Sequence, residues 1–348
     1  MRKVLIFVFL VILLATPVTA MDFSAPAAPD SAAEYLPREA DSFGEGLWNV
    51  VCAASEVLAP SLTEAVGCCL RCLGAMVLTA LVGQMAPGIS KSAVELAGVA
   101  AVAVILLKPS ASLISLGVET VKELGEYGRL LLPVMASSLA ARGGAGSATA
   151  LYMGTALFDS VLSWAMTAVL IPALWAVIAL SAAHAAAGEG LLGKVRDLAK
   201  GICEWSLKLG LYIFTGYMAV TGAVSGTADA AAGKAARLAI SGAVPVVGGI
   251  LADAADTVLL SASALGSGAG GWGILTVIAL FCAPVLRIGC QYLLLKLTAL
   301  LGEALGAGRS AALAGDLAGA LGLLMAMVST QAVLLLVSTF CFLKGVSG

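Results

Sequence analysis

Long apolar stretches separated by short polar ones make up most of the chain. Several reach the roughly 20 residues that an α-helix needs to cross the hydrocarbon core of a bilayer. Within them the apolar residues are continuous rather than alternating, which disfavours a β-barrel. The pattern therefore predicts an all-α, polytopic integral membrane protein. Its apolar stretches are residues 66–87, 93–107, 129–141, 150–186, 205–224, 239–264, 272–301 and 317–343.

The uneven lengths of these stretches leave the number of spans open. Residues 93–107 and 129–141 are shorter than a spanning helix requires. Residues 150–186 would form a helix of about 55 Å, nearly twice the hydrocarbon thickness, which Pro172 could divide. We therefore expect six to eight transmembrane helices, accompanied by re-entrant or in-plane pieces.

Two polar stretches, residues 117–129 and 188–208, are candidates for in-plane amphipathic helices. In the second stretch, apolar residues recur at helical spacing, and lysines and acids lie largely on the other side. Its basic bias predicts a cytoplasmic location. The alternative is a solvated face that links two spans. The apolar stripe comprises Leu191, Val195, Leu198, Ile202 and Trp205.

The N-terminus has the pattern of a secretory signal peptide. Arg2 and Lys3 precede a twelve-residue apolar run, and a small-residue cleavage site ends at Ala20. The following residues carry eight acids and one base up to position 64. We therefore expect a signal peptide over residues 1–20, an acidic extracytoplasmic segment over residues 21–65 and a polytopic membrane domain over residues 66–348. An uncleaved N-terminal anchor is the alternative.

Composition supports the membrane class and argues against several kinds of chemistry. Hydrophobic residues make up 60% of the chain and charged residues 11%, against about 25% charged in ordinary soluble domains. Basic residues form no patch of the kind that binds nucleic acid. The one histidine, His184, has no companions for a catalytic triad. We expect neither an enzyme nor a bound cofactor.

Two motifs resemble ligand sites only superficially. Cys68, Cys69 and Cys72 have no histidine nearby and enter an apolar stretch, so we interpret them as free thiols rather than metal ligands. Residues 266–271 match G-x-G-x-x-G, but the strand and the downstream acid of a dinucleotide site are missing. The sequence predicts no metal site and no nucleotide site.

Charged residues inside the apolar stretches are the most informative candidates. Each costs about 2.5–3.5 kcal/mol at the centre of a spanning helix on insertion scales, so its presence needs a reason. These residues could line an aqueous path or a subunit seam, or they could be paired inside the protein or placed at the interface. They are Asp159, Arg287, Lys296 and Glu303.

A helix break followed by two acids is the second candidate. Pro245, Gly248 and Gly249 interrupt an apolar stretch, and Asp253 and Asp256 follow on one face of a helix. Unwound backbone is tolerated in a membrane only where protein or water satisfies it. These five residues are therefore predicted to line a channel or to hold the broken helix.

Two pairs of glycines have the spacing that lets membrane helices approach closely. They are Gly222 with Gly226 and Gly315 with Gly319. The contact could lie within one subunit or between subunits. The second possibility, together with the channel interpretation, leads us to expect a homo-oligomer.

Two stretches carry a resemblance to a known family. Residues 238–265, LAISGAVPVVGGILADAADTVLLSASAL, and residues 127–144, YGRLLLPVMASSLAARGG, resemble the stage III sporulation protein AE family of endospore-forming bacteria. The resemblance covers about residues 117–343. It implies no catalytic residues and no cofactor.

The resemblance implies a function and partners. Proteins of this family are expected in the mother-cell membrane that surrounds the forespore, in a secretion-like channel or feeding tube that supports late forespore sigma factor activity. The implied partners are the other products of the stage III sporulation A operon (an ATPase, small membrane proteins and ring-forming proteins), membrane lipid and, indirectly, a forespore membrane protein. A secondary transporter or permease acting alone, or a non-conducting anchor for the ring proteins, remains the alternative.

Overall fold

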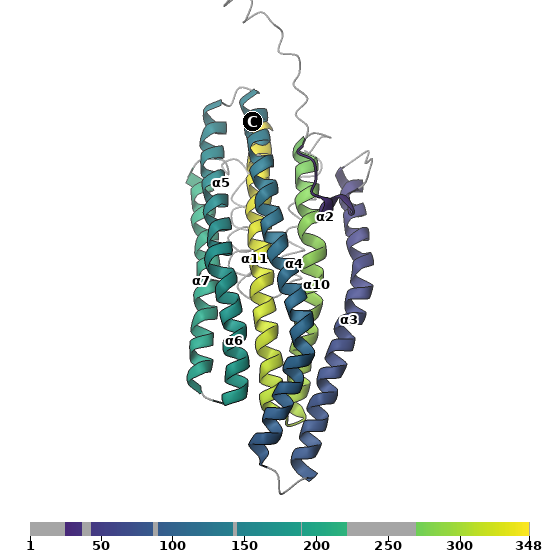
Figure 1. The fold of residues 1–348 in the computed structure, drawn as a ribbon. Helices are drawn as coiled ribbons and strands as arrows, with labels where there is room; N and C mark the ends of the chain where they lie inside the picture. Colours follow the sequence, from purple (N-terminus) through teal and green to yellow (C-terminus); the bar gives the residue numbers. More distant parts are fainter. Residues whose placement is uncertain are drawn as a thin grey trace, which may run out of the picture.

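The computed structural model describes residues 25–36, 43–85, 90–141, 145–188, 190–220 and 269–347. All elements in these ranges are helices, and they lie side by side in one elongated bundle (Figure 1). The prediction of an all-α protein is confirmed. The helices are α2 (Asp30–Ala33), α3 (Phe43–Met85), α4 (Lys91–Ala141), α5 (Ala145–Ala165), the π-helical turn η1 (Met166–Leu170), α6 (Ile171–Ala187), α7 (Gly190–Val220), α10 (Ala269–Ala304) and α11 (Gly308–Ser347).

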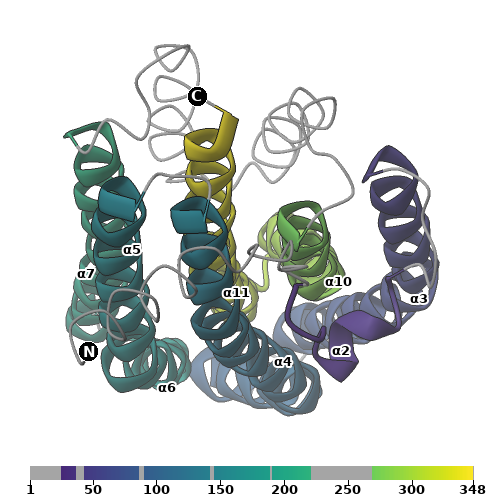
Figure 2. The ribbon, with the colours of Figure 1, turned by 90° about the horizontal axis from the view of Figure 1, so that it is seen from above.

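The antiparallel hairpin of α10 and α11 forms the centre of the bundle. Seen from above, α5, α6 and α7 lie on one side of α11, and α3 lies beyond α10 on the other (Figure 2). In the most apolar 18-residue segments of α10 and α11, 72% and 67% of the segment is buried inside the protein. The corresponding share in α3, α4 and α5–α6 is 28%. The outer helices therefore direct much of their apolar surface away from the protein.

Five of the described helices are long and apolar enough to cross a membrane. The protein is therefore a multi-pass membrane protein, as the sequence predicts. The predicted count of six to eight spans stays a prediction, because residues 221–268 lie outside the described ranges. The five helices cover Phe43–Met85, Lys91–Ala141, Ala148–Ala187, Gly270–Ala304 and Gly308–Leu343.

Helix α4 joins three stretches that the sequence analysis treats separately. The two short apolar stretches and the polar residues 117–129 between them form one continuous helix that includes Pro109 and Pro133. Glycines let this polar section approach α11: a Cβ on Gly117 would lie 2.7 Å from Leu324 Cγ. Residues 117–129 therefore belong to a long packed helix and do not form a separate in-plane one.

The stretch at 188–208 is likewise part of a longer helix. After a turn at Gly188, which has a left-handed backbone conformation with φ of 70°, α7 runs antiparallel to α6 from Gly190 to Val220. The predicted apolar stripe is exposed; Leu198 and Trp205, for example, are 65% and 63% exposed. The opposite face of α7 packs on α6 and α11.

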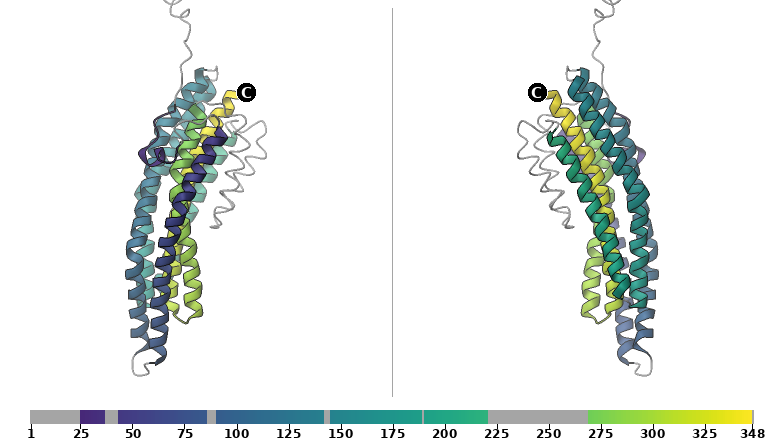
Figure 3. Two further views of the ribbon diagram at one scale, coloured as in Figure 1. Left: turned by 90° about the vertical axis from the view of Figure 1, so that its right-hand side faces the viewer. Right: turned by 90° about the vertical axis from the view of Figure 1, so that its left-hand side faces the viewer.

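Pro172 does not split the longest apolar stretch into two spans, because Ala148–Ala187 forms one long candidate span with a local irregularity before the proline. A proline has no N–H to donate to the carbonyl four residues earlier, so the regular helix is interrupted before it. The interruption is the π-helical turn at Met166–Leu170, after which α6 continues in nearly the same direction (Figure 3). The boundary predicted at residue 65 falls within α3, which is one uninterrupted helix.

Candidate functional site

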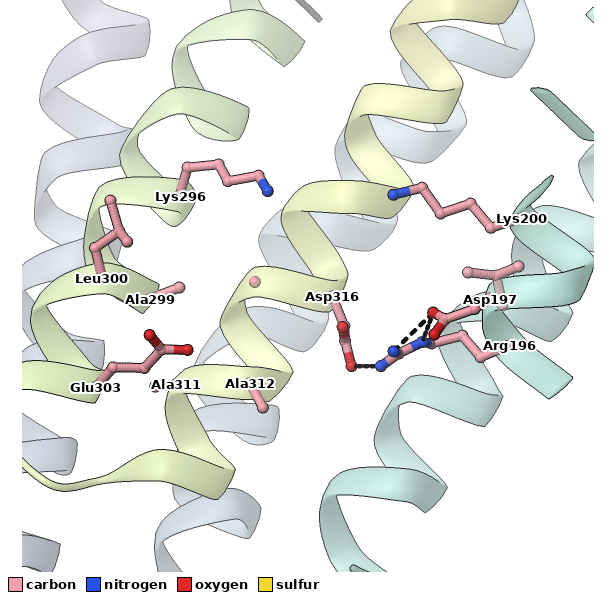
Figure 4. A pocket seen from close by; sticks show the side chains of 12 residues that line it. Arg196, Asp197, Lys200, Lys296, Ala299, Leu300, Glu303, Ala311, Ala312 and Asp316 are labelled. Atoms are coloured by element: carbon pink, nitrogen blue, oxygen red, sulfur yellow. Dashed lines mark hydrogen bonds and ion pairs between the residues drawn. The ribbon is translucent and has the colours of Figure 1, made fainter. Parts of the chain in front are cut away.

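A charged pocket lies between α7, α10 and α11, close to the α10–α11 turn (Figure 4). Its volume is about 380 Å³. This is within the range of about 300–1,000 Å³ that is usual for small-molecule sites. The charged residues that line it are Arg196, Asp197, Lys200, Lys296, Glu303 and Asp316.

Arg196 connects two of the helices that form this pocket. From α7 its guanidinium donates a hydrogen bond to Asp197 Oδ1 at 2.8 Å and pairs with the carboxylate of Asp316 on α11. The Arg196 and Asp316 side chains are only 15% and 18% exposed. Because little water screens this pair, it fixes α7 against the central hairpin more firmly than a surface ion pair would.

Two lysines extend toward α11 from opposite sides of the pocket. Lys200 comes from α7 and Lys296 from α10 (Figure 4). Gly319 makes room for the first, since a Cβ there would lie 2.8 Å from Lys200 Nζ. A Cβ on Gly315 would lie 3.5 Å from that of Ala299 on α10. The two glycines thus face different helices of the same subunit.

Of the predicted embedded charges, Lys296 and Glu303 share this pocket and are exposed. Within the described ranges, neither forms an ion pair. Arg287 is also exposed and lines a second pocket of about 230 Å³ between α2, α4 and α10. There, Ser31 Oγ of α2 donates a hydrogen bond to Glu123 Oε2 of α4 at 2.7 Å.

Asp159 is the embedded charge that the protein encloses. Its side chain in α5 is 1% exposed, and Gln331 Nε2 of α11 donates a hydrogen bond to its Oδ1 at 2.7 Å. The same nitrogen lies 3.3 Å from Ser163 Oγ, one turn further along α5. At Gly128, α4 packs closely against this carboxylate, because a Cβ there would lie 3.5 Å from Asp159 Oδ1. The cluster joins three helices.

The other predicted site residues lie outside the described ranges. This holds for the helix-break candidates and for the first glycine pair. They are Pro245, Gly248, Gly249, Asp253, Asp256, Gly222 and Gly226.

Sequence reasoning missed Arg196, Asp316 and Gln331. Each carried a usable signal: Arg196 interrupts an amphipathic stretch, Asp316 lies between paired glycines, and Gln331 is an amide within an otherwise apolar run. Hydropathy gives no partner for any of them, and their partners are 120 and 172 residues away in the sequence.

The three cysteines Cys68, Cys69 and Cys72 are buried in α3 as free thiols. Over the residues with a described structure, no three or more His, Cys, Asp or Glu side chains are placed to hold a metal ion.

Five apolar helices, a charged pocket beside the central hairpin and a carboxylate enclosed among three helices define a polytopic α-helical membrane protein. The model of the stage III sporulation protein AE family matches residues 55–343, and the chain belongs to this family. The resemblance found in the sequence is thereby confirmed.

A curated relative of the chain agrees with this assignment. Stage III sporulation protein AE of Bacillus subtilis (strain 168) is 23% identical over 195 residues, which is 56% of this chain and 49% of the relative. In this match the chain therefore spans about half the length of its curated relative. No solved structure matches the chain.

Proposed function

We propose that this chain is a membrane subunit of the channel that links mother cell and forespore, and that late forespore development and sigma factor activity depend on it. The observation that carries the proposal is the family match over residues 55–343. The multi-pass helical bundle supports it, because a membrane conduit requires helices of this length and apolarity.

The proposed setting is the mother-cell membrane around the forespore. The partners would be the other products of the stage III sporulation A operon and, through them, a protein of the forespore membrane. The low burial of α3, α4 and α5–α6 leaves apolar surface for lipid and for further copies of the chain. A homo-oligomer around a central opening is the arrangement that we propose.

The oligomeric state of the purified protein tests this arrangement directly. The full chain would be imaged by electron microscopy in nanodiscs. A closed ring with a central opening is expected, whereas a monomer at all protein concentrations would contradict the conduit.

In the native host, deletion of the gene is expected to abolish late forespore sigma factor activity, and a plasmid copy should restore it. Normal reporter activity in the deletion strain would remove the proposed role in sporulation.

One observation favours a second candidate, a secondary transporter that acts alone. The pocket between α7, α10 and α11 carries three cations and three carboxylates, and it is large enough for a small polar solute. A transporter would show saturable uptake in liposomes that contain only this chain. A non-conducting anchor for the ring proteins would instead tolerate neutralisation of Asp159, Arg287, Lys296 and Glu303 together.

A further inference from the structure

The enclosed Asp159 has too few hydrogen-bond donors for an ionised carboxylate. Gln331 Nε2 is the donor to it among the described residues, and the carboxylate is 1% exposed. An ionised carboxylate without water needs several donors or a close opposite charge. Arg129 of α4 is the charged group that interacts with Asp159, but it is exposed and forms no ion pair with it in the described structure.

A second polar atom in the same cluster also lacks a partner. Gln331 is fully buried, and its Oε1 has no hydrogen-bond donor among the described residues. Unpaired buried acceptors are rare in folded proteins, and each one needs an explanation. The amide oxygen of Gln331 therefore lacks a donor, and the carboxyl group of Asp159 beside this amide has too few donors. One added proton would satisfy both groups.

We propose that Asp159 and Gln331 form a proton-binding site at the seam between α5 and α11. The proton resides on Asp159 Oδ2, which donates it to Gln331 Oε1, while Gln331 Nε2 donates to Asp159 Oδ1. A protonated carboxyl has one O–H donor and keeps acceptor capacity, so acid and amide satisfy each other. The terminal torsions of the two side chains have broad minima, so they can adjust to this pairing.

The surroundings keep this pair away from water and from other charges. On α4, Gly125 and Gly128 face the cluster, and a Cβ on Gly125 would lie 2.8 Å from Ser163 Oγ. On α11, the neighbouring side chain is Leu335. Release of the proton would leave a negative charge at this contact, and among the described residues exposed Arg129 is the charge that could offset it, so proton binding is coupled to the packing of α5 on α11. This inference does not depend on the proposed function.

Infrared spectroscopy of the full chain in liposomes tests the proposal at the carboxyl group itself. At neutral pH we expect a C=O stretch of a protonated carboxyl that disappears in Asp159→Asn and shifts in Gln331→Leu. Loss of the band in Asp159→Asn assigns it to Asp159, which is the one buried carboxylate among the described residues. Absence of such a band in the wild-type protein at neutral pH would overturn the proposal, whatever the behaviour of the variants.

Thermal unfolding in detergent gives a second, independent readout. The native state would hold one proton more than the unfolded chain, whose aspartates lose theirs near pH 4. Stability should therefore fall as the pH rises above that value. In Asp159→Asn this component should be absent, because the asparagine amide donates to Gln331 Oε1 and its carbonyl accepts from Nε2 without titrating.

The control is Glu126→Gln, which removes an exposed carboxylate of α4 and should leave the pH dependence unchanged. Two results would count against the site: the same pH slope in Asp159→Asn and in the wild type, or stabilisation of the wild type alone by sodium ions at constant pH. The second result would mean that a metal cation occupies the place of the proton.

Discussion

Individual charged residues of this protein differ most in how much water surrounds them. Arg196 and Asp316 are nearly enclosed, whereas the ion pair between Arg309 and Glu95 is 34% and 48% exposed. An ion pair therefore contributes differently to the stability of the bundle at these two places. Pairs with little exposure are costly to break, because the remaining charge keeps too few partners.

This difference leads to a prediction at the residue scale. Asp316→Asn should lower the stability of the protein by about 1–3 kcal/mol, since it leaves the guanidinium of Arg196 with Asp197 as its remaining described acid. The matched control, Glu95→Gln, removes half of the more exposed pair and should cost at most about 1 kcal/mol. Unfolding in detergent, followed by circular dichroism, measures both. Equal effects of the two substitutions would contradict the assigned difference.

At the scale of single residues, the sequence indicated which charges were unusual but not which of them would be buried and which exposed. Asp159, Arg287, Lys296 and Glu303 all interrupt apolar runs in the same way. The structure encloses the first and exposes the other three. What separates them is contact with helices that are distant in the sequence. For Asp159 that contact is Gln331, which hydropathy alone cannot pair with it.

Among the helices, α7 has the least expected orientation. Its charged residues Arg196 and Lys200 face the central hairpin through the pocket, and the apolar stripe that includes Leu198 and Trp205 faces outward. A soluble bundle would have the opposite arrangement. A helix with charges inside and Leu, Ile and Trp outside is suited to a position in which lipid covers its outer face.

This orientation can be checked with tryptophan fluorescence. In a variant that keeps only Trp205, which is 63% exposed, quenchers attached to lipid acyl chains should reduce the emission strongly. The reference is a variant that keeps only Trp272 of α10, which is half-buried and should be quenched less. The interpretation fails if Trp205 is instead quenched by iodide in water and is insensitive to the lipid quencher.

At the scale of helices, the apolar pattern predicted most helical regions, but Ala148–Ala187 stays one long helix in spite of Pro172. The pattern could not predict that residues 117–129 continue α4. Glu119, Lys122 and Glu123 make this section polar, and polarity indicates a connection between spans. What keeps the section in the bundle is its other face, where Gly117 and Gly125 permit close contact with neighbouring helices.

For the whole molecule, the decisive feature is the central position of α10 and α11. Helix α10 contacts α2, α3 and α4, α11 contacts α4, α5, α6 and α7, and both are buried over most of their apolar length. The family match covers all described helices except α2, the first part of α3 and the last four residues of α11. The sequence predicted the membrane class and the family correctly, but equal hydropathy in all five long helices gave no sign of which ones are central.

A consequence for the whole bundle can be measured by hydrogen exchange. Amides of α10 and α11 should exchange most slowly and those of α7 faster, because local opening is easier where fewer contacts must be broken. The measurement is mass spectrometry of peptides from the full chain in detergent. Faster exchange in α10 than in α7 would show that the hairpin is not the stable centre.

The order of the helices along the chain also matters for the synthesis and assembly of the protein. Ribosomes make the N-terminal part first, so Asp159 is synthesised 172 residues before Gln331. At about 5–20 residues per second, this interval lasts roughly 10–35 s. During this interval the carboxyl group cannot yet pair with Gln331. Of the described helices, the central hairpin is therefore made last, after the helices that surround it.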